Sequence, residues 1–338
     1  MSDVHRIFGA ELSPYSVKVR SYFRYKGIPH QWIPRNQGAQ EEFQKYAKLP
    51  LIPLVVTPQA QGIQDSTPII ERMETLYPEP TIYPEDPALR FVSALLEEYA
   101  DEWGNKHMFH YRWFYEPDQR SAAERIARIN LPADAAAEVV GRALDAVRER
   151  MVPRLSFVGS SAETQHQIET SFHRLLGIVE DHLDGRRYLL GARPALADFG
   201  LFAQLYECST DPTPGAIMRN GSPRTLAWID RMLDPGRDEA ARSAAFETWD
   251  SLRPTLAPLL AREVAAVFLP WTLANAEAVQ SGAETFAVDI EGRPFRQGTQ
   301  KYHARSLAAL RGKYQATIDR SALDPILRSA GCLDAIAA

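Results

Sequence analysis

Hydroxyl-bearing side chains lie close together near the start of the chain, where a β-prone segment gives way to a helical one. The run Ser13-Pro14-Tyr15-Ser16 follows the β-prone residues 4–9 and opens a helix-period segment that ends at Lys26-Gly27. The first turn of a helix presents free backbone N–H groups and a partial positive charge, so an anion such as a thiolate is stabilised there. Serine followed by proline is also a common helix cap, and the pattern alone leaves both roles open.

The elements around this run predict a small α/β domain. Residues 30–34 are a second β-prone segment directly after the helix, and this strand–helix–strand order implies a parallel pair with a right-handed crossover. A third strand is expected at residues 51–56, and residues 63–68 lead into a helix at residues 69–76. Prolines crowd the following residues and predict a linker, so we place the first domain at residues 1–84.

The rest of the chain is predominantly helical in pattern, and we expect an all-helical domain over residues 85–250. Its predicted helices are residues 88–113, 134–158, 164–185, 195–208 and 223–233.

Residues 251–338 are mixed and predict a folded C-terminal extension that packs on the helical domain. A hairpin is expected at 285–297, where it could cover a cleft, and two helices are expected at about 300–317 and 322–330. Proline at position 270 should kink or restart the helix in which it lies. The extension should not be a disordered tail, because its aromatic residues need burial: Phe268, Trp271, Phe286, Phe295, Tyr302 and Tyr314.

The composition excludes several classes of protein. The formal net charge is -5, from 38 Lys+Arg against 43 Asp+Glu, and no basic stripe points to a nucleic-acid partner. No uninterrupted apolar stretch approaches the ~20 residues of a membrane span, and the first residues lack a secretory pattern, so we expect no membrane partner and a cytoplasmic location. The two cysteines, Cys208 and Cys332, exclude a disulfide framework and are expected to be core thiols.

Five features in chain order resemble the cytosolic glutathione transferases over about residues 4–235. They are the βαβ unit, a strand that begins at Ile52-Pro53, the pair Asp65-Ser66, and the segments Leu196-Ala197-Asp198-Phe199 and Ala227-Trp228-Ile229-Asp230-Arg231-Met232. The resemblance implies an α/β, thioredoxin-like N-terminal domain followed by an all-α C-terminal domain. It also implies glutathione as co-substrate and a homodimer in which the helix at 88–113 is the expected contact.

The resemblance assigns a role to each matching residue. Ser13 matches the catalytic serine of the theta- and zeta-like classes, which faces the glutathione sulfur, and Tyr15 is the alternative hydroxyl donor. Ile52 precedes the family's cis-proline, here Pro53, and would pair main chain to main chain with the cysteine of glutathione. Asp65 and Ser66 match the pair that holds the γ-glutamyl group, and they can cap a helix at the same time.

A hydroxyl donor at this position is chemically sufficient for activating a thiol. A free thiol has a pKa of ~8.5 and is only a few per cent thiolate at neutral pH. A hydrogen bond to a charged group contributes ~1.5–3 kcal/mol, which lowers the pKa of the bound thiol by about one to two units. A helix N-terminus adds ~0.3–1 kcal/mol, so no general base is needed.

The aromatic segment from Trp103 to Tyr115 matches the family helix that lines the cleft for a second, hydrophobic substrate. Trp103, His107 and Tyr111 share one helical face and, with Tyr15, are the candidates for contact with that substrate. Packing in the core or in a dimer is the alternative. His107 and His110 are spaced to ligate a metal, but no third ligand presents itself, so no metal site is expected.

These observations predict a glutathione transferase, in which a protein-stabilised thiolate of glutathione attacks a hydrophobic electrophile. Two departures from the family pattern support an alternative. Leu51 stands where many members have a basic residue, which leaves Arg35, Lys45 or Lys48 to bind the glycyl carboxylate, and Ala195 stands where a capping serine or threonine is expected. These departures favour a non-catalytic glutathione-fold binding or assembly protein. A glutathione-dependent reductase or lyase is a further alternative, because the same site can host that chemistry.

Overall fold

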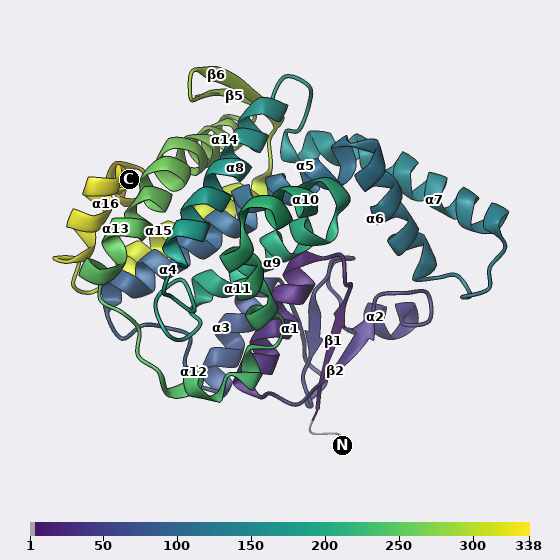
Figure 1. The fold of residues 1–338 in the computed structure, drawn as a ribbon, viewed down its shortest axis with the longest axis horizontal. Coiled ribbons are helices and arrows are strands. Elements are labelled where there is room, and N and C mark those ends of the chain that lie inside the picture. The colour runs from purple at the N-terminus through teal and green to yellow at the C-terminus, as the bar shows by residue number, and fades with distance from the viewer. Residues whose placement is uncertain (1–3) are drawn as a thin grey trace.

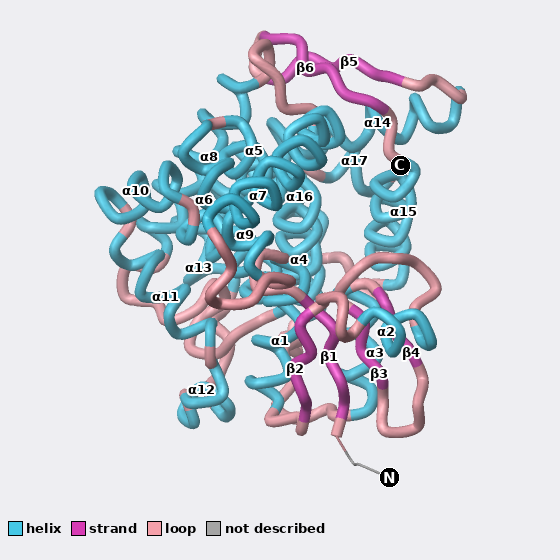
Figure 2. The backbone as a smooth tube through the Cα atoms, turned by 90° about the vertical axis from the view of Figure 1, so that its right-hand side faces the viewer, coloured by secondary structure: helices cyan, strands magenta, loops and turns pink. Residues whose placement is uncertain are grey.

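The structure, a computed structural model, describes residues 4–338. Its first part is a four-stranded sheet with helices packed on it (Figures 1 and 2). The elements are β1 (His5–Gly9), α1 (Pro14–Lys26), β2 (His30–Pro34), α2 (Gln40–Tyr46), β3 (Leu54–Val56), β4 (Gly62–Gln64) and α3 (Ser66–Leu76). The strand order is β2-β1-β3-β4, with β1 parallel to β2 and the other pairs antiparallel. The predicted parallel βαβ unit is therefore confirmed.

Helix α1 joins this sheet to the helices that follow. Pro14 occupies its first turn and Gly27 ends it with φ 66°, a left-handed conformation that glycine adopts without strain. Nearly all of its residues are buried, because it packs on α3 on one side and on a helix of the second part, α9 (Leu196–Thr210), on the other.

The second part is entirely helical and is built around α9. Before α9 come α4 (Pro87–Tyr99), the π-helical segment η1 (Ala100–Gly104), α5 (Asn105–Phe114), α6 (Glu116–Arg128), α7 (Ala137–Met151), the 3-10 segment η2 (Val152–Val158) and α8 (Gln165–His182). After it come α10 (Pro212–Gly221), α11 (Pro223–Leu233), η3 (Pro235–Arg237) and α12 (Glu239–Ser243). This succession confirms the predicted fold class, an α/β domain followed by a helical one.

Asp198 near the start of α9 is a structural residue. Its Oδ2 accepts a hydrogen bond from the Ala195 N–H at 2.9 Å. Its Oδ1 accepts from the Leu189 N–H at 2.8 Å and from Trp228 Nε1 at 3.0 Å. A complete capping box also needs a side-chain oxygen at position 195 that accepts a hydrogen bond from the Asp198 N–H. Alanine has none, so only the bond made by the Asp198 carboxylate forms.

The C-terminal extension is folded and covers α4. Its elements are α13 (Trp249–Leu259), the π-helical η4 (Leu260–Phe268), α14 (Leu269–Ser281), β5 (Thr285–Ile290), β6 (Arg293–Gly298), α15 (Lys301–Ala316), α16 (Leu323–Ala330) and α17 (Leu333–Ala337). Elements η4, α15 and α16 pack on α4, and within residues 88–113 only Arg90 remains exposed. The chain's own extension thus occupies much of the face that the resemblance implies as a dimer contact.

Residues 249–281 form one continuous helical stretch through α13, η4 and α14. By length and composition alone this stretch could cross a membrane, but 56% of its most apolar window is buried inside the fold, as in the core helix of a soluble protein. Pro270 lies in the first turn of α14, directly after the π segment, where the hydrogen-bond pattern changes from π-helical to α-helical.

The predicted hairpin is confirmed as β5–β6, but its predicted place is wrong. It packs on α14 and η2, at the end of the molecule away from the sheet (Figures 1 and 2), so it does not cover a cleft beside Ser13. The aromatic residues expected to be buried in the extension are buried except Tyr302, which is 47% exposed.

Candidate functional site

Ser13 lies at the junction between β1 and α1, with its hydroxyl available to a ligand. It is the N-cap of α1, and its Oγ accepts a hydrogen bond from the Ser16 N–H at 3.3 Å. No residue of the described chain accepts a hydrogen bond from the hydroxyl itself, and the side chain is only half-buried. Ser13 therefore acts as a cap and keeps a free donor at the positive end of a helix, so both roles left open by its sequence are compatible.

The Tyr15 hydroxyl is already engaged. It donates a hydrogen bond to the main-chain oxygen of Asp101 at 2.8 Å. Burial raises the pKa of Tyr15 well above its usual value, and the carboxyl groups of Asp101 and Asp65 raise it further. Ser16 carries another hydroxyl nearby, but its Oγ is fully buried and unpaired within residues 4–338. Of the three, only the Ser13 hydroxyl is both half-exposed and without an acceptor within residues 4–338.

Arg112 of α5 braces the loop that carries Ser13. Its Nη1 donates a hydrogen bond to the Leu12 carbonyl at 2.9 Å. The guanidinium is itself held by ion pairs of 2.7 Å to Glu207 and 2.7 Å to Asp211. Nothing in the sequence pattern indicates this role, because Arg112 comes from α5 and its partners from the end of α9 and the residue after it, and the relative placement of these helices depends on tertiary packing.

The Ile52–Pro53 peptide bond is cis, as the resemblance implies. The main-chain N–H and C=O of Ile52 make no hydrogen bond with any residue that the structure describes, so both are available to pair with an extended ligand. Leu51 is 61% exposed and supplies no charge beside them.

The basic residues considered for the glycyl carboxylate differ in availability. Arg35 donates to Gln40 and stacks on the ring of Phe43, and Lys45 pairs with Glu41 at 3.1 Å. Lys48 is exposed, and within residues 4–338 its side chain makes no ion pair.

Asp65 is held in an unusual backbone conformation directly before α3. Its φ is 78°, a region that costs a residue with a side chain about 1–3 kcal/mol and that occurs preferentially at functional sites. Its carboxylate makes no capping hydrogen bond to α3. Asp65 therefore occupies the N-cap position of α3, but its carboxylate is not used for capping and is bonded elsewhere.

Ser66 is the first residue of α3, and its side chain belongs to a buried ionic network. Lys18 Nζ donates to Ser66 Oγ at 3.3 Å, to Thr67 Oγ1 at 3.2 Å and to Asp101 Oδ2 at 2.6 Å, and it also pairs with Glu97. The Ser66 hydroxyl in turn donates to Asp101 Oδ2 at 3.4 Å. Because this hydroxyl is used internally, Ser66 offers a ligand its backbone N–H at the start of a helix.

A residue of the extension contacts the first domain at this point. The hydroxyl of Tyr302, in the first turn of α15, donates a hydrogen bond to Asp65 Oδ2 at 2.9 Å. This contact is not predictable from the sequence, because the two residues are 237 positions apart and no local pattern couples them.

The residues predicted to contact a second substrate other than Tyr15 lie in the core. Trp103, His107 and Tyr111 are at most 2% exposed. Trp103 Nε1 and His107 Nε2 both bond to Ser171 Oγ at 2.9 Å. Burial lowers the pKa of His107 to about 3, so its imidazole is neutral. The packing alternative holds for these three residues, and the expected contact with a second substrate is not available in this structure.

The remaining titratable candidates are also buried. Cys208 and Cys332 are free thiols with no exposed surface, as expected, and burial raises the pKa of Cys332 to about 12. His110 bonds to Ser160 Oγ at 2.7 Å and to Glu169 Oε1 at 3.0 Å. Within residues 4–338, no group of three or more His, Cys, Asp or Glu side chains is arranged to hold a metal ion.

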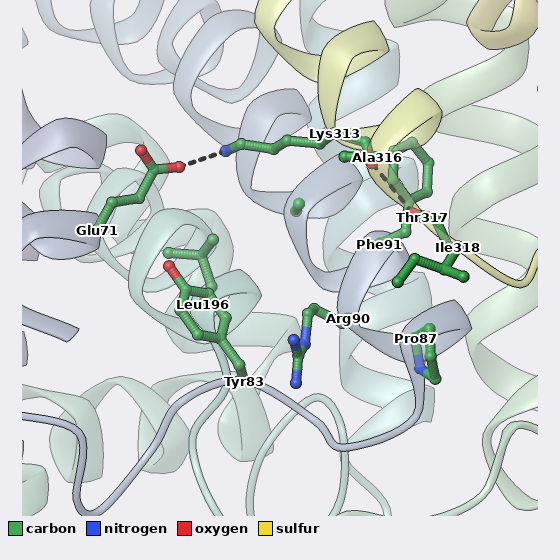
Figure 3. Close-up of a pocket in the computed structure, with 11 residues that line it drawn as sticks. Glu71, Tyr83, Pro87, Arg90, Phe91, Leu196, Lys313, Ala316, Thr317 and Ile318 are labelled. Atoms are coloured by element: carbon green, nitrogen blue, oxygen red, sulfur yellow. Dashed lines mark hydrogen bonds and ion pairs between the residues drawn. The ribbon is translucent and has the colours of Figure 1, made fainter. Parts of the chain in front are cut away.

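A cavity of about 410 Å³ lies away from Ser13, between α3, α4 and α15 (Figure 3). Phe91 and Leu196 contribute to its apolar wall, and an ion pair of 2.8 Å joins Lys313 to Glu71 across one side. None of the residues predicted to bind glutathione lines it.

Comparison with known proteins identifies both halves of this architecture. A model of the glutathione S-transferase N-terminal domain matches residues 7–81, and a model of the glutathione S-transferase C-terminal domain matches residues 123–231. Together these matches cover more than half of the chain, which therefore belongs to the glutathione transferase superfamily. No curated protein sequence matches the chain.

Several solved structures are similar to this one at low sequence identity. A glutathione S-transferase from Methylobacterium radiotolerans, in complex with glutathione sulfonate, is 18% identical with a TM-score of 0.43, over 72% of this chain and 97% of that one. A glutathione S-transferase from Rhodospirillum rubrum is 18% identical with a TM-score of 0.44, over 73% and 97%. The tau class enzyme of mango, Mangifera indica, is 16% identical with a TM-score of 0.43, over 75% and 97%.

Proposed function

We propose that this chain is a glutathione transferase in which Ser13 stabilises the thiolate of bound glutathione for attack on a hydrophobic electrophile. The observation that carries the proposal is the unused hydroxyl hydrogen of Ser13 at the N-terminus of α1. Ile52, with its free main-chain groups, and Asp65, with its uncapped carboxylate, provide the further contacts that a γ-glutamyl tripeptide needs.

In this proposal different residues bind different parts of glutathione. The main chain of Ile52 pairs with the cysteine of glutathione, which brings the sulfur to Ser13. The backbone N–H of Ser66 receives the γ-glutamyl carboxylate, and Asp65 receives the γ-glutamyl ammonium. The exposed ammonium of Lys48 is the candidate partner for the glycyl carboxylate, in place of the basic residue that Leu51 replaces.

The Ser13→Ala variant tests this assignment. Loss of the hydroxyl should raise the pKa of the bound thiol by about one to two units and slow turnover about tenfold or more at neutral pH, with little change in affinity for glutathione. The pKa is read from the ultraviolet absorbance of the thiolate as the pH is varied, and turnover from a spectrophotometric conjugation assay.

Ser16→Ala is the matched control, because it removes a buried hydroxyl one helical turn away that cannot reach the thiol. Its thiol pKa and turnover should equal those of the wild type. Unchanged kinetics in Ser13→Ala, or an equal effect of both variants, would remove Ser13 from the mechanism. A wild-type chain that neither binds immobilised glutathione nor conjugates it would favour the alternative, a non-catalytic binding or assembly protein.

A further inference from the structure

The start of α15 is fixed to α14 and η1 by contacts that do not involve Asp65. The side chain of Asn275, on α14, makes two hydrogen bonds that clamp the main chain of Gln300. Its Nδ2 donates to the Gln300 carbonyl at 2.9 Å, and its Oδ1 accepts from the Gln300 N–H at 2.8 Å. Asn275 is fully buried, so the clamp is shielded from water. The chain therefore enters α15 at one defined position, two residues before Tyr302.

The residue after Tyr302 is anchored as well. His303 Nδ1 pairs with Glu102 of η1, and the His303 ring packs edge-on against Trp271 with the ring centroids 4.9 Å apart. Tyr302 is held between these two anchors, which explains how a side chain that is 47% exposed can keep its hydroxyl on Asp65 Oδ2.

The groups gathered at Asp65 are rich in hydrogen-bond acceptors. Tyr302 and Tyr15 have already donated their hydroxyl protons, so their oxygens can only accept further bonds. Asp65 Oδ1 accepts no hydrogen bond from residues 4–338, and Asp101 Oδ1 is buried without a partner there. Lys18, the cation of the neighbouring network, already donates to four acceptors, so it has no free N–H to offer a ligand.

A primary ammonium is the ligand group that these acceptors fit. It carries a positive charge and three N–H donors, whereas a carboxylate or a neutral acceptor would be left facing unpaired oxygens. The backbone N–H of Ser66 next to Asp65 suits the carboxylate that an α-amino acid carries beside its ammonium.

We propose that Tyr302 of the C-terminal extension completes, with Asp65 and Tyr15, a subsite that recognises the free α-amino group of the γ-glutamyl end of glutathione. This inference rests on the proposed function, in which Asp65 binds the γ-glutamyl group. Tyr302 is a positioning residue: its hydroxyl holds Oδ2 of Asp65 and leaves Oδ1 directed to the ligand. It uses one of the two carboxylate oxygens, so it does not occupy the position of the ammonium.

Calorimetric titration of the full chain with two ligands tests the inference. The ligands are glutathione and the analogue that lacks the γ-glutamyl amino group. The wild type should prefer glutathione. Tyr302→Phe should weaken glutathione binding about five- to tenfold and leave the affinity for the analogue unchanged. In an Asp65→Asn background, Tyr302→Phe should have no further effect on glutathione, because the two residues act through one contact.

Tyr314→Phe is the matched control. Tyr314 lies on the same helix and its hydroxyl also donates to a carboxylate, Asp324 Oδ1 at 2.9 Å, so the substitution removes an equivalent hydrogen bond far from Asp65. It should leave both affinities unchanged.

Three results would overturn the inference alone: Tyr302→Phe binds glutathione as well as or better than the wild type, it loses both ligands equally, or Tyr314→Phe shows the same loss. A wild-type chain that binds neither ligand would overturn the proposed function, and the inference with it. The wild-type titration therefore separates the two failures before any variant is compared.

Discussion

Lys18 is the residue on which the charge balance beneath the site depends. Its ammonium is fully buried and pairs with Glu97 and with Asp101 Oδ2 at 2.6 Å. Burial alone would lower the pKa of Lys18, but these two carboxylates raise it, so the ammonium stays charged. Burial raises the pKa of Asp101 to about 7 despite the same pair. A single lysine thus shares its charge between two carboxylates, and the region as a whole favours an incoming cation.

Glu98 lies beside this network without sharing its cation. Its Oε1 is buried and has no hydrogen-bond partner within residues 4–338. Burial and then the charges of Glu97 and Asp101 raise the pKa of Glu98 to about 8, although the hydroxyl of Ser306 and the ammonium of Lys313 act in the opposite direction. The Glu98 carboxyl is therefore largely protonated at neutral pH.

This raised pKa predicts a loss of stability as the pH rises. The pKa of Glu98 in the folded chain lies above the unfolded value of about 4.3, so between these two pH values the folded chain binds more protons than the unfolded chain. The stability that the protonated Glu98 contributes is therefore complete below about pH 4.3 and is lost as the pH rises through about 8. Glu98→Gln keeps the side chain neutral at every pH. As the pH rises from about 5 to 8, the free energy of unfolding should fall less in this variant than in the wild type, by on the order of 1–3 kcal/mol.

Denaturant unfolding at several pH values measures this difference. Glu138→Gln is the control, because Glu138 is exposed on α7, and its stability should follow that of the wild type at each pH. If the free energy of unfolding changes with pH in the same way in Glu98→Gln and in the wild type, the Glu98 carboxyl is ionised over this whole pH range and the prediction is wrong.

At the residue scale the sequence could identify candidates but could not choose between their roles. Ser13 is recognisable from its place before a helix, yet only the structure shows that the Tyr15 hydroxyl is bonded to the main chain of Asp101. Asp65 is the N-cap of α3 by position, and only the structure shows that its carboxylate bonds to Tyr302 and not to α3. These distinctions depend on contacts between distant segments, which carry no local sequence signal.

At the scale of elements, periodicity predicts most helices and strands because apolar spacing reports directly on one buried face. The helices at 164–185 and 223–233 are found as α8 and α11 within a few residues of their expected ends. The π-helical segments η1 and η4 were not predictable, since a local change from one helical hydrogen-bond pattern to another leaves the spacing of apolar residues nearly unchanged.

Gln297 on β6 joins the hairpin to the helical body. Its Oε1 accepts hydrogen bonds from Lys106 Nζ at 2.7 Å and from Trp271 Nε1 at 2.9 Å, and its Nε2 donates to the Phe157 carbonyl at 2.6 Å. Lys106 is fully buried 4.0 Å from the centroid of the Trp271 ring, and burial lowers its pKa well below the usual range. One amide therefore satisfies polar groups from three other elements.

Gln297→Ala should destabilise the whole chain by about 2–4 kcal/mol, because it leaves the buried donors of Lys106 and Trp271 with one acceptor fewer. The free energy of unfolding in denaturant measures this loss. Arg296→Ala is the control from the same strand, since Arg296 is exposed, and it should stay within about 0.5 kcal/mol of the wild type. Equal losses in the two variants would mean that the strand, rather than the amide, carries the effect.

At the scale of the whole molecule, the family fold was predictable because its motifs fall in a fixed order along one chain. The placement of the extension was not, since the family pattern ends near residue 235 and the apolar surface of residues 251–338 could pack on any exposed face. The structure places this surface on α4, the helix that the resemblance implies as a dimer contact. The extension thus covers α4 and also delivers Tyr302 to Asp65.

This arrangement predicts that the chain is a monomer of 38.0 kDa in solution. A stable interface buries about 800 Å² on each partner, and within residues 88–113 only Arg90 remains exposed to contribute. Light scattering on the eluate of a size-exclusion column at micromolar concentration gives the mass directly. Because Tyr302 reaches Asp65 within one chain, dilution should also leave the affinity for glutathione unchanged.

A mass of twice that value would contradict this prediction, and Arg90→Glu would then locate the contact. If α4 faces a second copy, reversing the charge of its exposed Arg90 should weaken the dimer, whereas Arg296→Glu, which changes an exposed charge on the distant hairpin by the same amount, should not. A dimer that survives Arg90→Glu must use another surface. The site at Asp65 would still be completed in cis, because the hydrogen bond from Tyr302 is made within each chain.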